Sequence, residues 1–261
     1  MRALSGLIFI LACCWFSAVS AQDKPITVCA DADPPPWTYW KLDGEGKKTR
    51  EVIGSSVELV TAAFALIGKT VVFSGELPWK RCLYEVEEQT IDFAMDAYFD
   101  TERAKTFDYS VHYNTLTPQI FYLKSTPVSI TSVNDLKKYR GCGINGFSYV
   151  HYGLSLRDLD LGAGHDSLYR KLHAKRCDYF VEELEVIAGY NLIGKHYLDD
   201  ADIAHGPVPG ASAPAKYLLT AKNGRNSGLL KQLNLAIVEL IRSGKAEEAW
   251  NRHAAGLAFK P

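Results

Sequence analysis

Arg103 is the residue whose type and setting point most directly to a binding chemistry. It lies in the stretch DTERAKTFDYSVHY, residues 100–113, just before an apolar and aromatic run that reads as a strand leading into a loop. A planar guanidinium can donate two parallel hydrogen bonds to the oxygens of a carboxylate, whereas lysine supplies charge without that fork. The alternative is a surface arginine in an ordinary salt bridge.

Other polar side chains give weaker signals of chemistry. Asp100, Glu183 and His151 are available as acids and bases, but no nucleophile motif accompanies them. The seven histidines include no closely spaced chelating pair. We therefore expect neither a metal nor an organic cofactor.

Four cysteines remain beyond the N-terminal segment, and an even number in an exported chain favours disulfides. Four cysteines allow three sets of pairings, which the residues alone do not separate. No two of them are spaced as in a Cys-x-x-Cys metal motif. They are Cys29, Cys82, Cys142 and Cys177.

The N-terminal residues predict an export signal. A basic start at Arg2 precedes an uncharged run, and the small residues Val19-Ser20-Ala21 form a cleavage site, so residues 1–21 read as a cleaved signal peptide. A membrane anchor is the alternative, although the uncharged run is marginal for a span. The residues that end at Cys13 also loosely resemble a lipoprotein box, and lipidation there would tether the protein.

The charge composition indicates which classes of binding partner to expect. Removal of residues 1–21 takes away one arginine, which leaves 28 basic and 30 acidic side chains and a formal charge of −2. This balance gives no reason to expect nucleic acid or an anionic membrane surface as a partner. The remaining chain is long enough for one large domain or two small ones.

Strand and helix patterns alternate along the first part of the chain. Ser55 and Glu58 form an expected capping box for a helix that Gly68 ends. The order strand, helix, strand, helix, strand is typical of a parallel sheet covered by helices. The expected elements are 26–32, 55–67, 70–73, 78–90 and 91–95.

A second α/β unit follows after Thr126. Asp166 is the expected cap of its main helix, and Gly244 ends a long amphipathic helix near the C-terminus. The expected elements are a short helix from 133, a strand at 142–145, a helix to 175, strands at 179–181 and 216–221, and a helix at 229–241.

Several motifs together resemble the periplasmic solute-binding proteins of ABC importers, in the polar amino acid family. The likeness covers nearly the whole chain after the signal. Thr-Glu-Arg-Ala with the downstream Phe-Asp-Tyr-Ser is similar to the family's Pro-Glu-Arg-Ala and the strand that follows it. The motifs are ADADPPPWTYW, TIDFAMDAYFDTERAKTFDYS, CDYFVEELE and LLKQLNLAIVELIRSGKAEEAWNRH.

The resemblance implies an α/β fold of the two-lobe periplasmic binding-protein type (type II). Each lobe is then a mostly parallel sheet flanked by helices, and the ligand lies in the cleft between the lobes. Lobe one is expected at residues 22–117 with 216–261, and lobe two at 118–215.

The resemblance also implies roles for single residues. Arg103 corresponds to the arginine that grips the ligand's α-carboxylate. Glu183, with Glu182 as its rival, stands at the acidic position that accepts the ligand's amino group. Ser148 offers a hydroxyl where the family has Gly-Thr-Thr.

Aromatic and acidic side chains complete the expected site. Trp37 and Trp79 stand where the family lines its cleft, although a tryptophan is more often core. Tyr98 and Asp100 belong to the loop that leads to Arg103. Asp100 replaces a usual threonine and has two readings, contact with a cationic group of the ligand or pairing with Arg103.

These departures widen the expected ligand from an amino acid to an amino acid or a related small carboxylate. The function implied is non-enzymatic capture of that solute in the periplasm by a monomer, for delivery to an inner-membrane ABC permease. The alternatives are a dehydratase-like enzyme and a sensing partner of a membrane receptor. Because rocking lobes should not be stapled to each other, we expect the disulfides Cys29–Cys82 and Cys142–Cys177.

Overall fold

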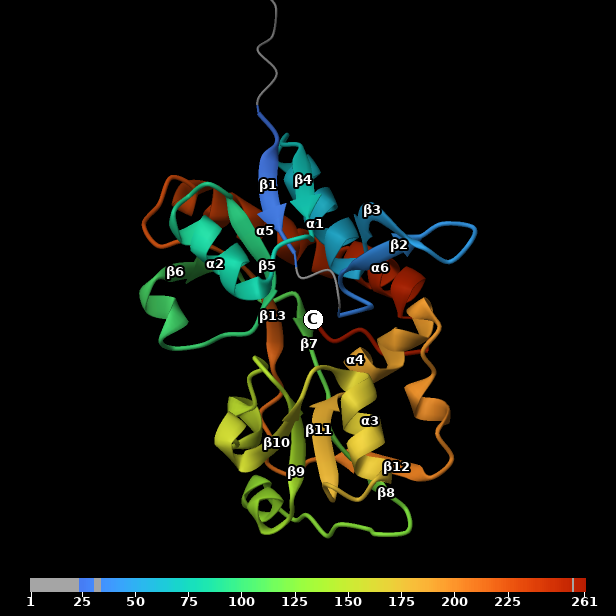
Figure 1. The fold of residues 1–261 in the computed structure, drawn as a ribbon. Helices are drawn as coiled ribbons and strands as arrows, with labels where there is room; N and C mark the ends of the chain where they lie inside the picture. The colour runs from blue at the N-terminus through green and yellow to red at the C-terminus, as the bar shows by residue number, and fades with distance from the viewer. Residues whose placement is uncertain (1–23, 31–33, 255) are drawn as a thin grey trace, which may run out of the picture.

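Two lobes form the protein, as Figure 1 shows for a computed structural model that describes residues 24–30, 34–254 and 256–261. The expected export signal at residues 1–21 lies outside the described residues, as does Cys13. The elements at both ends of the described chain, β1 (Ile26–Cys29) and α6 (Lys245–His253), belong to the same lobe. Within the described ranges, no helix has the length and apolar character needed to cross a bilayer.

The first lobe is built on a mixed sheet with the order β4-β1-β5-β13-β6, and β7 pairs with β13. β1 is parallel to β4 and β5, as the sequence predicts, whereas β13 is antiparallel to its partners. A hairpin of β2 and β3 lies beside the sheet. The other elements are β2 (Tyr39–Leu42), β3 (Lys48–Ile53), α1 (Ser55–Leu66), β4 (Val71–Ser74), α2 (Trp79–Glu87), β5 (Phe93–Ala97), η1 (Arg103–Lys105), β6 (Phe107–Tyr109), β7 (Asn114–Thr115), β13 (Ala215–Ala221) and α5 (Ser227–Arg242).

Strand alternation divides the first core between two faces. On β5, Phe93 and Met95 pack in the cluster that contains the buried sides of α1 and α5, whereas Ala94 packs in the cluster that contains Cys82 and Val86 of α2. Successive strand side chains point to opposite faces of a sheet. All five residues of β5 are therefore buried.

The second lobe has a five-stranded sheet with the order β10-β9-β11-β8-β12. β9 is parallel to β10 and β11, and β8 is antiparallel to β11 and β12. The elements are β8 (Pro118–Leu123), η2 (Val133–Lys138), β9 (Gly141–Ile144), η3 (Val150–Tyr152), η4 (Leu156–Asp158), β10 (Leu159–Gly162), α3 (His165–His173), β11 (Tyr179–Glu183), α4 (Leu184–Gly189), η5 (Tyr190–Ile193), η6 (Tyr197–Asp199) and β12 (Ile203–Pro207).

The predicted helix at residue 55 forms, but its predicted capping box is wrong. Gly54 is the N-cap residue, with φ +141°, and a Cβ there would lie 2.0 Å from the Trp37 carbonyl oxygen. The Ser55 hydroxyl donates to the Pro36 carbonyl, and Glu58 bonds to His253. Both side chains took tertiary partners in place of the local ones.

The predicted cap of the second lobe's main helix is wrong in the same way. α3 begins two residues earlier, after its N-cap Gly164, with no side-chain cap. The Asp166 carboxylate pairs with Lys195 at 2.6 Å instead.

The chain crosses between the sheets twice, after β7 and before β13, and apolar packing joins the lobes at this junction (Figure 1). Trp37, Leu116 and Trp250 of the first lobe share one buried cluster with Val186 and Tyr190 of the second. The close approach explains Gly189, where a Cβ would lie 2.2 Å from the Pro35 carbonyl oxygen.

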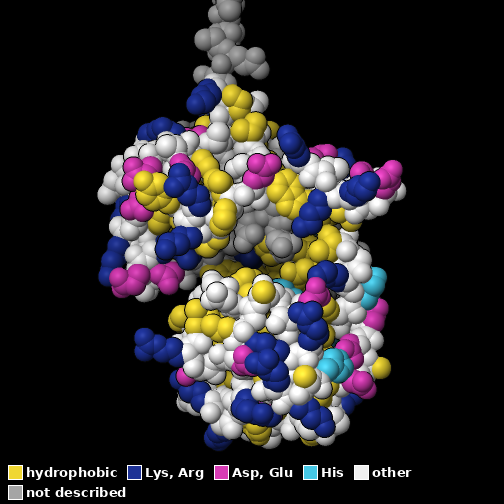
Figure 2. Space-filling model, viewed as in Figure 1, with side chains coloured by type: hydrophobic (Ala, Val, Ile, Leu, Met, Phe, Trp, Pro, Cys, Tyr) yellow, Lys and Arg dark blue, Asp and Glu magenta, His cyan; other side chains and the backbone are white. Residues whose placement is uncertain are grey.

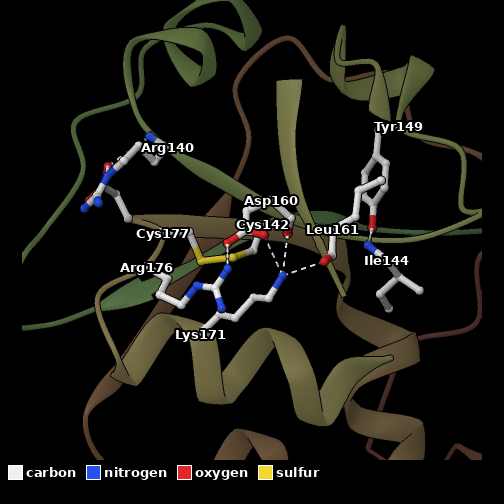
Figure 3. Close-up of a disulfide and its surroundings, with 10 residues drawn as sticks. Arg140, Cys142, Ile144, Tyr149, Asp160, Leu161, Lys171, Arg176 and Cys177 are labelled. Carbon is white, nitrogen blue, oxygen red and sulfur yellow. Dashed lines mark hydrogen bonds and ion pairs between the residues drawn. A yellow bond between two sulfur atoms is a disulfide. The ribbon is translucent and has the colours of Figure 1, made fainter. Parts of the chain in front are cut away.

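Both expected disulfides are present, and each lies within one lobe. Cys29–Cys82 links β1 to α2, and Cys142–Cys177 links β9 to the segment before β11. Figure 3 shows Lys171 of α3 reaching β10 beside the second bridge, where its Nζ donates to the Asp160 carboxylate at 2.8 Å. The second bridge therefore fixes the segment before β11 to β9, and the Lys171 contact fixes α3 to β10.

We predict that loss of the second bridge weakens folding without abolishing ligand binding. Its sequence separation is 35 residues, so Cys142→Ser with Cys177→Ser should lower the free energy of unfolding by about 2–4 kcal/mol, because the open chain gains conformational freedom. Urea unfolding measures this change, and peptide mapping without reductant checks the pairing. A bridge from Cys29 to Cys142 would contradict the assignment.

Asp92 ties the start of the first sheet to the start of α5. One carboxylate oxygen accepts hydrogen bonds from the Thr27 amide and hydroxyl, at 2.9 and 2.8 Å. The other accepts from Arg225 and Asn226, at 2.7 and 3.1 Å. Burial alone would raise the pKa of Asp92, but these donors outweigh it and lower the pKa to about 2.

We predict that Asp92 makes folding sensitive to acid. Because its pKa is lower in the folded state than the ordinary value of 3.8, its contribution is complete above about pH 4 and is lost as the pH falls toward 2. Asp92→Asn should lower the free energy of unfolding at pH 7 by about 1–2 kcal/mol and flatten this part of the pH profile. Urea unfolding between pH 2 and 7 tests this, with the exposed Asp202→Asn as control; equal profiles for the two variants would refute it.

Candidate ligand site between the lobes

The surface is hollowed between the two lobes, with apolar side chains along the rim (Figure 2). Tyr98, which directly follows β5, and Glu183, at the end of β11, meet at this junction. The Tyr98 hydroxyl donates to the Glu183 carboxylate at 3.0 Å. Two residues of the predicted site, from different lobes, are thus in direct contact.

Arg103 lies on η1 and reaches back to the same tyrosine. Its guanidinium donates to the Tyr98 carbonyl at 2.9 Å and lies 5.8 Å from the centroid of the Trp79 ring. Among the described residues, no carboxylate forms an ion pair with this guanidinium. Asp100 accepts a hydrogen bond from the Arg103 backbone N–H at 2.8 Å, so it fixes the turn and leaves the guanidinium available.

Glu183 is surrounded by donors. Its side chain is 2% exposed and also accepts hydrogen bonds from His151 Nε2 at 2.7 Å and the Tyr152 hydroxyl at 3.3 Å. Burial acts to raise the pKa of Glu183, but the bonds from His151 and its other neighbours lower it to about 2. The carboxylate is therefore charged and already has donors from both lobes.

Glu182, the residue before Glu183 on β11, has different partners. It pairs with the buried His165 at 2.9 Å, and it accepts the Glu183 N–H at 3.2 Å. Burial and the charge of Glu183 raise the pKa of Glu182, and burial lowers the pKa of His165 to about 4. This pair is consequently more a neutral part of the core than a ligand contact.

Trp37 is core rather than an open cleft wall. It is 1% exposed, and its indole N–H donates to Asn114 Oδ1 at 2.8 Å. One face of the ring nevertheless meets a cation, because Lys216 Nζ lies 4.6 Å from the Trp37 centroid and 4.6 Å from the Tyr98 centroid. Such contacts are attractive, and more so where water is excluded.

Lys216 was not among the predicted site residues, whereas Ser148 was predicted to offer its hydroxyl to the ligand. Lys216 is 4% exposed, and the only signal for it is a lysine at the start of the apolar strand AKYLLTA. Ser148 is exposed on the loop after β9. Within the described part of the chain, no group of three or more His, Cys, Asp or Glu residues is arranged to hold a metal ion.

Asp96 of β5 is a further buried acid. One of its oxygens accepts from Ser56 at 2.7 Å and Tyr113 at 2.8 Å, and the other is enclosed without a hydrogen-bond partner. Burial raises the pKa of Asp96. The charge of Lys216 and the donors Ser56 and Tyr113 act against this rise.

Comparisons with known proteins concern the family and the fold of the chain. No curated protein sequence matches the chain. Among solved structures, the substrate-binding protein of an amino acid ABC transporter is 21% identical, over 88% of this chain and 99% of that chain, with a TM-score of 0.67. A Streptococcus pneumoniae substrate-binding protein bound to L-arginine is 22% identical, over 88% and 96%, with a TM-score of 0.68.

A histidine kinase sensor domain that is similar to periplasmic binding proteins is also 22% identical, over 92% of this chain and 99% of that chain, with a TM-score of 0.70. At these identities the likeness concerns the fold. The family model of the bacterial extracellular solute-binding proteins, family 3, matches residues 26–255. The chain therefore belongs to the bacterial extracellular solute-binding proteins, family 3.

Proposed function

We propose that the protein captures a small polar carboxylate, an amino acid or a related acid, between its lobes and delivers it to an ABC permease. The observation that carries this proposal is the position of the Arg103 guanidinium. It lies beside Trp79 and donates to the carbonyl of Tyr98, whose hydroxyl makes the bond between the lobes. Among the described residues, no carboxylate forms an ion pair with it. A guanidinium in such a place can bind a carboxylate with two parallel hydrogen bonds. The solved substrate-binding proteins of amino acid ABC transporters, which have a similar fold, support a solute-binding function.

The lobes act as two bodies in this proposal. Lobe one is residues 22–117 with 216–261, and lobe two is residues 118–215. Ligand binding favours the closed arrangement, in which Tyr98 and Glu183 touch, and the permease recognises that form. The protein works as a monomer, and within-lobe disulfides leave the hinge free.

The proposed location is the periplasm. Residues 1–21 serve as the export signal and are removed after Ala21. Lipidation at Cys13 would keep the same compartment but anchor the protein to a membrane. Mass spectrometry of the protein from its own host distinguishes the two by the mass and sequence of the mature N-terminus.

A sensing role is the second candidate, because a histidine kinase sensor domain has the same fold at a TM-score of 0.70. In that role the closed form would signal to a separate receptor. Loss of uptake after deletion of this gene supports import, and normal uptake with an altered transcriptional response supports sensing. Enzymatic turnover, for which the His151–Glu183 pair is the available acid and base, is not expected; a product formed from the bound ligand would favour it.

We predict that Arg103→Ala weakens ligand binding by roughly 2–5 kcal/mol, because the variant loses two charge-assisted hydrogen bonds and leaves the bound anion without compensation. Arg103→Lys should recover only part of the loss, since an ammonium lacks the planar fork. Calorimetry with the best hit of a thermal-shift screen of amino acids and small carboxylates measures both.

Lys105→Ala is the control for this prediction, because Lys105 lies in the same short helix, is exposed and pairs with Glu102. It should bind like the natural protein, and all three variants should fold. Unchanged affinity in Arg103→Ala would show that the guanidinium serves only to hold the Tyr98 carbonyl.

A further inference from the structure

Lys216 is a buried cation at the lobe junction. It lies on β13 opposite Asn114 of β7, is 4% exposed, and has its Nζ between the rings of Trp37 and Tyr98. Among the residues that the structure describes, no carboxylate forms an ion pair with it. The charge of Lys216 acts to lower the pKa of Asp96 and of Glu182, so both acids lie within its electrostatic range without forming an ion pair. An ammonium removed from water is costly, and two ring faces with acids at this range compensate only part of that cost.

A second cation lies on the other side of the same tyrosine. Arg103 donates to the Tyr98 carbonyl, and Lys216 faces the Tyr98 ring. Neither has an ion pair with a carboxylate in the described ranges. Two such cations around one residue at the lobe junction favour a ligand with two negative groups.

The acids at the junction, in contrast, have little to offer an ammonium group. Glu183 is 2% exposed and holds three protein donors, so a ligand amine would have to displace Tyr98 or His151. Glu182 is occupied by His165 and a backbone N–H. The free oxygen of Asp96 is enclosed, and burial raises the pKa of that group. Glu185 accepts from the Thr117 amide and hydroxyl and pairs with Lys260 at 3.7 Å.

We propose that the ligand is a small dicarboxylate without an α-amino group, with one carboxylate on Arg103 and the other on Lys216. This inference rests on the proposed function and assigns Lys216 as a residue that determines ligand specificity. Closure would place the second carboxylate beside the ammonium, and the Trp37 and Tyr98 rings would hold that ammonium in position. The arrangement accounts for a lysine where the strand otherwise buries apolar side chains.

Matched pairs of compounds test the proposal. Calorimetry on the full mature protein compares succinate with aspartate and glutarate with glutamate, which differ only in the amino group. It also covers unbranched dicarboxylates of three to eight carbons, and butanoate and pentanoate, which lack the second carboxylate. We expect the best dicarboxylate to bind at least about tenfold more tightly than its amino and monocarboxylate counterparts, a difference of about 1.4 kcal/mol.

Variants of Lys216 test whether this residue binds the second carboxylate. Lys216→Met keeps an unbranched chain between the rings and removes the charge, so it should weaken the dicarboxylate at least about tenfold while leaving the weak monocarboxylate unchanged. Lys216→Gln serves if the methionine variant misfolds, and the exposed Lys231→Met on α5 should bind like the natural protein. Equal dicarboxylate affinity in the natural protein and both Lys216 variants would overturn the assignment.

The outcomes separate this inference from the proposed function. Tighter binding of aspartate, glutamate or another amino acid than of its deaminated partner overturns the inference and leaves the solute-binding role intact. If Asp100→Asn also removes that preference, Asp100 is the group that holds the amine. Failure of every carboxylate and amino acid to bind overturns the proposed function and the inference together.

Discussion

The hydrogen bond from Tyr98 to Glu183 is the interaction on which the arrangement of the junction depends. It joins the carboxyl end of β5 in one lobe to the carboxyl end of β11 in the other. Open α/β sheets bind their ligands at the carboxyl ends of their strands, so this contact marks the place where two such ends face each other. Because Glu183 is charged and 2% exposed, it requires donors, and they come from both lobes. Separation of the lobes would remove one donor and admit water in its place.

Covalent and apolar contacts are distributed in a way that suits relative motion of the lobes. The two disulfides stiffen each lobe on its own, between a sheet and the helix or loop beside it. Contact across the junction relies on packing of side chains such as Trp37, Val186 and Trp250, and on the polar bonds around Glu183. Such contacts can break and form again within one functional cycle, which a disulfide across the junction would prevent.

The fold does not specify which ligand is bound; a few side chains of the site do. The same two-lobe architecture occurs in an amino acid transporter's binding protein and in a histidine kinase sensor domain. Function in such a fold has to be argued from the site itself. At this site, no carboxylate in the described ranges forms an ion pair with Arg103 or Lys216 of the first lobe, whereas Glu183 of the second lobe already has three donors. This contrast is the basis of the proposed preference for a dicarboxylate.

The sequence by itself determined the two α/β units, their main helices and strands, the fold family and the even set of cysteines. These follow from local periodicity, turn residues and motifs, which act over short stretches of chain. The expected contact set also included Tyr98, Glu183 and Arg103, which the structure brings together. Tertiary structure decided what such patterns do not encode. Ser55 and Asp166 lost their predicted capping roles because distant residues offered better partners. Lys216 became part of the junction because β13 returns to the first sheet beside Tyr98, 118 positions away along the chain, and only folding places two such residues face to face.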